Sequence, residues 1–216
     1  LGGSLLLTVV IALACFSFLS GGIQNYRGLL DGPLQESQLV DQANLEFKSQ
    51  VQEWKNVLLR GKDQAAQDKY WGQFEEQERK VQDILRKLVG EAGEDIGLKN
   101  QVEKLRSEHQ SLSAAYRKGK AAFIAAGADP AAGDKAVQGI DRATSDQMGA
   151  LVTQLHQRSV EQASSISASA ERTVLLGTFV LLGASVVIAL LSLWLVNRNL
   201  ITPIKSLIEH IGRLSQ

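Results

Sequence analysis

The sequence predicts an all-α protein: an up-down-up-down four-helix bundle continuous with two transmembrane helices. Two runs without a charged residue lie near the two ends of the 216-residue chain. The segment between them is rich in Gln, Glu, Lys, Ala and Leu, which favour helices, and the whole chain has three prolines. In that segment apolar residues recur at alternating spacings of three and four, the heptad pattern of helices that pack through one apolar seam.

The first apolar run covers Leu5 to Leu19 and predicts a transmembrane helix over residues 1–21. A cleaved signal peptide is the alternative, because apolar runs near a chain start often have that role. Such peptides carry a basic region before the apolar core and a small-residue cleavage site after it. No basic region precedes this run, and only Ser20-Gly21-Gly22 could serve as the cleavage site. We therefore expect an uncleaved helix.

The second run, Val174 to Val196, predicts a transmembrane helix over residues 173–196. Its length of about 23 residues is enough to cross roughly 30 Å of hydrocarbon. Basic residues follow it at Arg198, Lys205 and Arg213. Because basic residues near membrane ends favour the cytoplasmic side, this end is predicted inside the cell and residues 22–172 outside the cytoplasm.

Helix-ending signals divide residues 22–172 into four helices. Arg60-Gly61 is typical of a helix C-terminus, and a cluster of glycines (Gly90, Gly93 and Gly97) marks the next turn. Asp129 is the predicted N-cap of the fourth helix, with Pro130 at its first position. The outer helices are expected over 22–60 and 131–172, about 60 Å each, with a kink at Pro33.

The heptad pattern also predicts which residues are buried. The expected seam positions are Val40, Asn44, Phe47, Val51, Trp54 and Leu58 in the first helix; Tyr70, Phe74, Gln77, Val81, Ile84 and Leu88 in the second; Leu98, Val102, Leu105, His109, Leu112, Tyr116, Gly119 and Phe123 in the third; and Val137, Thr144, Met148, Leu151 and Leu155 in the fourth. Trp71 lies off this seam and is expected to be exposed.

Four of these seam positions are polar and fall at a similar depth, one in each helix: Asn44, Gln77, His109 and Thr144. Buried polar groups without partners cost about 1–3 kcal/mol each, so these side chains should pair with each other, with water or with a ligand. A polar layer that fixes helix register is the favoured interpretation. A ligand-binding cavity is the alternative.

Catalytic, metal and nucleic-acid sites are not predicted. The three histidines are scattered, no cluster of His, Cys and Glu has metal-ligand spacing, and Cys15 is the single cysteine. The zero formal net charge excludes a general nucleic-acid binder, which carries a basic excess. We expect no enzyme activity and no cofactor.

The last segment, residues 197–216, resembles the first helix of a HAMP linker, the relay module of chemoreceptors and sensor kinases. A proline follows the second span, and apolar residues continue at helical spacing. The matching residues are Arg198, Pro203, Ile204, Leu207, Ile211 and Leu214. The resemblance implies a signal-relay role for Pro203, Ile204, Leu207 and Ile211, and the family's connector and second helix would follow beyond Gln216.

The chain as a whole resembles the methyl-accepting chemotaxis proteins, in the order and lengths of its helices and in the stretch from Phe47 to Gly61. The resemblance implies a homodimer in the bacterial inner membrane, with its sensor domain in the periplasm. It further implies a small-molecule ligand or a solute-loaded periplasmic binding protein, movement of the fourth helix, and control of a histidine kinase and its adaptor through a cytoplasmic part outside this chain.

The same resemblance implies an anion site built from arginines of the first and fourth helices, for which Arg60, Arg142 and Arg158 are the candidates. Arginine suits this task because its planar guanidinium binds carboxylates with two hydrogen bonds. Two other functions share the architecture: the input region of a sensor histidine kinase, and a membrane-anchored helical protein that senses nothing.

Overall fold

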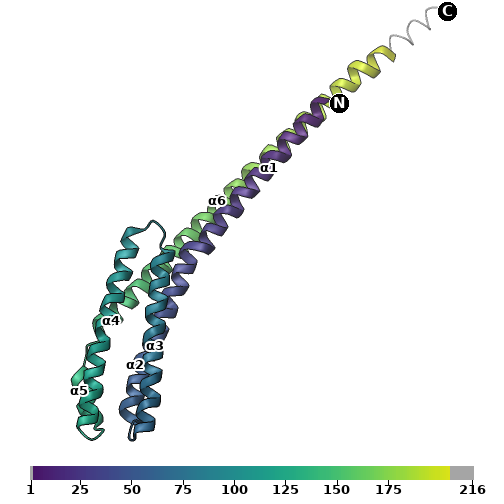
Figure 1. Ribbon diagram of the computed structural model, residues 1–216. Coiled ribbons are helices and arrows are strands. Elements are labelled where there is room, and N and C mark those ends of the chain that lie inside the picture. Colours follow the sequence, from purple (N-terminus) through teal and green to yellow (C-terminus); the bar gives the residue numbers. More distant parts are fainter. Residues whose placement is uncertain (1, 205–216) are drawn as a thin grey trace, which may run out of the picture. The chain divides into compact units, whose positions relative to one another are not determined.

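The computed structural model describes residues 2–204, with side chains from Thr8 onward, and this part of the chain divides into two compact units. One unit is formed by residues 27–164. The other holds the two apolar segments, residues 1–26 and 165–216. Every regular element in the described residues is helical, which confirms the all-α prediction (Figure 1). The predicted relay residues Leu207 and Ile211 lie outside the described residues.

The apolar unit contains α1 (Gly2–Leu29) and the C-terminal part of α6 (Arg142–Val196). By length and composition, two helices of the structure are long and apolar enough to cross a membrane. Their large apolar side chains are exposed: Phe16 is 71% exposed and Leu193 68%. Near the end of the second apolar segment the guanidinium carbon of Arg198 lies 5.1 Å from the centre of the Trp194 ring. Surfaces of this kind are suited to lipid rather than to water.

A short π-helical segment, η1 (Leu30–Leu34), separates α1 from α2 and contains the predicted kink. Gly32 has non-helical torsion angles, φ −126° and ψ −105°, and Pro33 follows it. Proline has no N–H and its ring collides with the carbonyl four residues earlier, so an unbroken α-helix is unfavourable here. A second π-helical segment, η2 (Asn197–Ile201), precedes Pro203 in the same way.

Residues 27–164 form the bundle. Its helices are α2 (Gln35–Arg60), α3 (Gln64–Glu91), α4 (Ile96–Ala125), α5 (Pro130–Val137) and the first part of α6. Three aspartates begin helices: the side chains of Asp63, Asp95 and Asp129 accept hydrogen bonds from backbone N–H groups two or three residues later. These caps satisfy groups that a helix start leaves unpaired. Asp129 with Pro130 confirms the predicted N-cap and first position, which here begin α5.

The prediction of one unbroken helix over 131–172 is wrong. α5 ends at Val137 and α6 begins at Arg142. Between them Gly139 adopts φ +75°, a left-handed conformation that glycine reaches without the steric penalty of a Cβ. The intervening turn lets α5 contact both α4 and α2.

The observed core confirms the predicted seam in the second half of the bundle. All eight predicted positions of α4, from Leu98 to Phe123, are buried. Thr144, Met148, Leu151 and Leu155 of α6 are buried as predicted, and Val137 is buried in α5. The Tyr116 hydroxyl reaches from α4 to Asp141, 3.4 Å away, and adds a polar link to this apolar packing.

The predicted seams of α2 and α3 are partly wrong. In α2, Ala43 and Gln50 are fully buried, whereas Asn44 is only half-buried. In α3, Trp71 is buried, with 8% of its surface exposed, whereas the prediction was that it is exposed. Its ring stacks on the Phe74 ring, with 4.8 Å between the ring centres. The buried side of a bundle helix is wider than the narrow stripe of a two-stranded coiled coil, because it contacts two neighbours. Spacing alone cannot choose between adjacent positions on its margins.

Two glycines allow close approach between α4, α5 and α2. A Cβ added to Gly119 would lie 2.5 Å from Cγ1 of Val137 and 3.2 Å from the Trp54 ring. A Cβ on Gly133 would lie 2.5 Å from Cδ2 of Leu58. Larger side chains at these two positions would force the helices apart.

Substitution of Gly119 by alanine is therefore expected to destabilise the bundle by about 1–3 kcal/mol, the usual cost of overpacking. Gly72 is the matched control, because it also lies in a helix but a Cβ there meets nothing within 4 Å. Gly72→Ala should stabilise by about 0.5–1 kcal/mol through helix propensity. Denaturant unfolding of the two variants measures both values, and equal effects would contradict the close approach at Gly119.

Candidate functional site

A buried polar contact joins three helices of the bundle around His109. Nε2 of His109 lies 2.7 Å from Oε1 of Gln50 in α2, and Nδ1 lies 2.7 Å from Nε2 of Gln82 in α3. Gln82 also donates to the backbone carbonyl of Arg106, 3.0 Å away. A glutamine oxygen accepts and a glutamine nitrogen donates, so the neutral imidazole with its proton on Nε2 satisfies both contacts.

The environment of His109 favours this neutral form. The residue is fully buried, with the Phe47 ring edge-on at 5.4 Å between centres. Burial lowers the pKa of the His109 imidazole to about 4, because the protonated ring would lose its hydration. Both ring nitrogens are engaged, so His109 has no free donor or acceptor for a ligand. This geometry favours the register-fixing interpretation of the polar layer.

The residues that form the polar layer in the structure differ from those predicted from the sequence. His109 contacts Gln50 and Gln82, and none of the predicted partners Asn44, Gln77 and Thr144 hydrogen-bonds to it. Asn44 and Gln77 are half-buried and Thr144 is buried. Sequence reasoning missed Gln50 and Gln82, which lie next to predicted seam residues. The signal that could have found them is a glutamine one position away from a predicted seam residue in each of α2 and α3, at the depth of His109.

The three predicted arginines do not come together within the bundle. Arg60 ends α2 beside the α2–α3 turn, with its guanidinium carbon 5.9 Å from the centre of the Tyr70 ring. Arg158 lies at the α3–α4 turn, where Nη1 is 2.6 Å from Oδ2 of Asp95. These turns lie at opposite ends of α3, which is 28 residues and about 42 Å long. Arg142 is the exposed first residue of α6. A single chain therefore cannot bind one small ligand with both Arg60 and Arg158.

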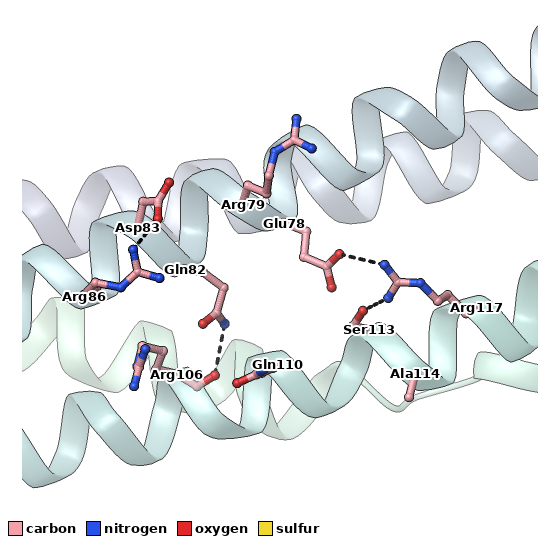
Figure 2. A pocket seen from close by; sticks show the side chains of 10 residues that line it. All are labelled: Glu78, Arg79, Gln82, Asp83, Arg86, Arg106, Gln110, Ser113, Ala114 and Arg117. Carbon is pink, nitrogen blue, oxygen red and sulfur yellow. Dashed lines mark hydrogen bonds and ion pairs between the residues drawn. The ribbon is translucent and has the colours of Figure 1, made fainter.

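A different group of arginines lines a groove between α3 and α4, with a volume of about 680 Å³ (Figure 2). It was not predicted, because its residues lie on the polar faces of both helices. The lining residues are Glu78, Arg79, Gln82, Asp83, Arg86, Arg106, Gln110, Ser113, Ala114 and Arg117. Four of the ten are arginines and two are carboxylates, so the formal charge of the lining is +2.

Ion pairs hold most of these arginines loosely in place. Arg117 bonds to Ser113 and reaches α3, where it pairs with Glu75 at 3.3 Å and Glu78 at 3.8 Å; Figure 2 draws the contacts with Ser113 and Glu78. Arg86 pairs with Asp83 at 2.8 Å, and both side chains are about two-thirds exposed. Exposed pairs of this kind contribute at most about 1 kcal/mol, so a ligand could replace them.

Two further arginines belong to the rims of the groove. Arg106 pairs with Glu103 at 2.8 Å on its own helix, α4. Arg79, on α3, is exposed and makes no hydrogen bond or ion pair within the described residues. Arg79 is thus a lining guanidinium that no carboxylate of the described residues pairs with, and its charge is part of the +2 of the lining.

No cluster of metal-ligating side chains is present in the part of the chain that the structure describes. No group of three or more His, Cys, Asp or Glu side chains there is placed to hold a metal ion. His156, the other described histidine, pairs with Asp41 at 2.6 Å on the exposed surface of α6 and α2.

Burial of neutral His109 makes bundle stability depend on pH. The folded-state pKa of about 4 is lower than the ordinary 6.5, so stability is complete above pH 6.5 and is lost as the pH falls toward 4. The loss should approach about 3 kcal/mol. Urea unfolding across this range should show the loss in the parent chain and His156→Gln. His109→Gln should abolish it; a loss unchanged in His109→Gln would contradict the prediction.

Comparison with known proteins relates the whole chain to one family. No protein-family profile matches, and no solved structure matches. The methyl-accepting chemotaxis protein CtpH of Pseudomonas aeruginosa is 60% identical over 215 residues, which cover all of this chain and 38% of CtpH. The chain therefore spans well under half the length of that relative. Over its entire length this chain is thus similar to a methyl-accepting chemotaxis protein, in agreement with the resemblance seen in its sequence.

Proposed function

We propose that the chain is the sensory and transmembrane region of a bacterial chemoreceptor that detects a solute outside the cytoplasm. The 60% identity to a methyl-accepting chemotaxis protein carries this proposal. Two helices with the length and composition of membrane spans and a separate helical bundle support it. The same identity favours a chemotaxis output over a sensor kinase or a non-sensing structural protein.

In this proposal the membrane spans are residues 1–21 and 173–196, in the inner membrane. The bundle of residues 22–172 lies in the periplasm, and residues 197–216 begin a HAMP linker. The basic residue Arg198 after the second apolar segment supports this orientation, since basic residues favour the cytoplasmic side. Its guanidinium next to Trp194 is typical of a membrane–water interface.

The continuity of α6, which runs from Arg142 to Val196 without a break, supports a relay along this helix. An uninterrupted helix can carry a small displacement along its axis because its backbone hydrogen bonds resist extension. Pro203 and Ile204, directly after η2, would pass the movement to Leu207 and Ile211 in the linker. We propose that the receptor acts as a homodimer and controls a histidine kinase and its adaptor through a part beyond this chain.

For the ligand we propose a small, multiply charged anion bound in the α3–α4 groove. The lining has an excess positive charge, and guanidinium groups form strong paired hydrogen bonds with carboxylate and phosphate oxygens. Arg79, without a partner of its own in the described residues, is the group that an anion would satisfy first. The ligand arrives free or on a periplasmic binding protein.

Topology is tested with single cysteines in a Cys15→Ser background. Gly72→Cys places a thiol on the exposed surface of α3, and Asn199→Cys places one in η2. A membrane-impermeant maleimide should label Gly72→Cys in spheroplasts and Asn199→Cys only after permeabilisation. The reverse pattern, or labelling of both in intact cells, would contradict the proposed orientation.

The ligand class is tested by titrating the chain in nanodiscs with phosphate, sulfate and citrate, using serine and glucose as uncharged-overall controls. Arg79→Gln should weaken binding of the active anion roughly 10-fold or more, as expected for loss of one charge-assisted hydrogen bond. Arg60→Gln and Arg142→Gln are the matched controls and should bind normally. If only those two controls bind more weakly, the site lies at the first and fourth helices, and the proposal that the anion binds in the α3–α4 groove is wrong.

A further inference from the structure

Glu36 is a buried carboxylate at the start of α2, in a position that neither the polar layer nor the arginine groove explains. The residue is only 5% exposed, and its Oε2 atom is buried without a hydrogen-bond partner. It follows η1 closely, where the chain bends at Gly32 and Pro33. Carboxylates are seldom buried in this way unless they are paired, because the ionised form loses its hydration.

The charged groups that face Glu36 come from three other elements. Within the part of the chain that the structure describes, Arg158 of α6 is the cation that faces it, with Nη1 4.0 Å from Oε2 of Glu36. That same nitrogen is much closer to Oδ2 of Asp95, at 2.6 Å, so its main partner is the α4 N-cap. Glu91, at the end of α3, and Asp95 both repel a charge on Glu36. Glu36 and Asp95 thus share one guanidinium, and a third carboxylate, Glu91, lies close enough to repel a charge on Glu36.

These surroundings favour the protonated form of Glu36. Burial raises the pKa of its carboxyl above the ordinary 4.5; the Arg158 charge opposes this effect, and the Asp95 and Glu91 charges add to it. A protonated carboxyl has no charge to desolvate and gains an O–H donor for a neighbouring oxygen. Arg158 then pairs with Asp95 alone.

We propose that Glu36 is a proton-binding site that couples external pH to the attachment of α6 at the α3–α4 turn. Arg158 belongs to α6, and Asp95 and Glu91 flank the turn, so protonation of Glu36 changes the contacts that hold these elements together. Protonation of Glu36 on acidification removes its repulsion with Asp95 and Glu91 and tightens this end of the bundle. The site responds to protons and is distinct from the α3–α4 groove.

The sign of the effect separates it from that of His109. A carboxyl whose folded-state pKa is raised adds stability at low pH, and this stability is lost as the pH rises through the folded-state pKa. The relevant range therefore starts near 4.5 and extends upward. His109 acts in the opposite direction over an overlapping range. Only a comparison of variants at each pH isolates Glu36.

The test measures unfolding of the 216-residue chain in nanodiscs between pH 4.5 and 8 for the parent and Glu36→Gln. Glutamine imitates the protonated carboxyl, so the parent should be less stable than Glu36→Gln at pH 8 and should approach it as the pH falls. Glu94→Gln is the matched control, because Glu94 is an exposed carboxylate in the same turn. Its difference from the parent should not change with pH.

If Glu36→Gln does not fold, two further measurements still test the proposal. Infrared difference spectra between pH 8 and 5 should show a protonated-carboxyl band in the parent and in Glu94→Gln. Arg158→Gln should move the appearance of this band to higher pH, because the one attractive charge is removed. Absence of the band from the parent, or a band that Arg158→Gln leaves unmoved, would overturn the proposal, as would a pH-independent difference between the parent and Glu36→Gln.

Discussion

The paired hydrogen bonds of His109 are the constraint on which the alignment of the bundle depends. An apolar seam tolerates sliding by one heptad, because leucine and valine pack against many neighbours. The imidazole is less tolerant, since both of its nitrogens are satisfied only when Gln50 and Gln82 lie at the same depth. Loss of these contacts would leave buried polar atoms unpaired at about 1–3 kcal/mol each. These contacts thus fix the register of α2, α3 and α4 relative to one another.

The two ends of the bundle differ in how tightly their helices pack. Beside Gly119 the chain packs Trp54 and Val137 without room for another methyl group. Trp54 and Phe74 both meet the Tyr116 ring edge-on, at 5.5 and 5.0 Å. The other end is polar, with Glu36, Asp95 and Arg158 in place of rings. The tightest packing therefore lies at the end of the bundle with the α2–α3 turn. The buried charged groups lie at the end with the α3–α4 turn.

This division suits the proposed receptor, in which the signal would leave through α6. The proposed anion groove uses α3 and α4, which end within the bundle, whereas the proposed proton site includes Arg158 of α6 itself. An anion in the groove would act on α6 through the packed core, where Leu151 and Leu155 are fully buried. A proton on Glu36 would act on α6 by direct contact. The two stimuli would then converge on one helix.

The sequence alone determined the class of fold, the two apolar helices and the seam of α4, because these depend on composition and on a strong local period. Asp129 with Pro130 was equally readable, since a cap involves neighbours in the chain. The burial of Trp71 and Gln50, the break at Gly139 and the Glu36 cluster were decided only by tertiary structure. Each depends on which side of a helix meets a second and a third helix. Contacts between residues as far apart as Gln50 and His109, or Glu36 and Arg158, leave no period in the sequence that could predict them.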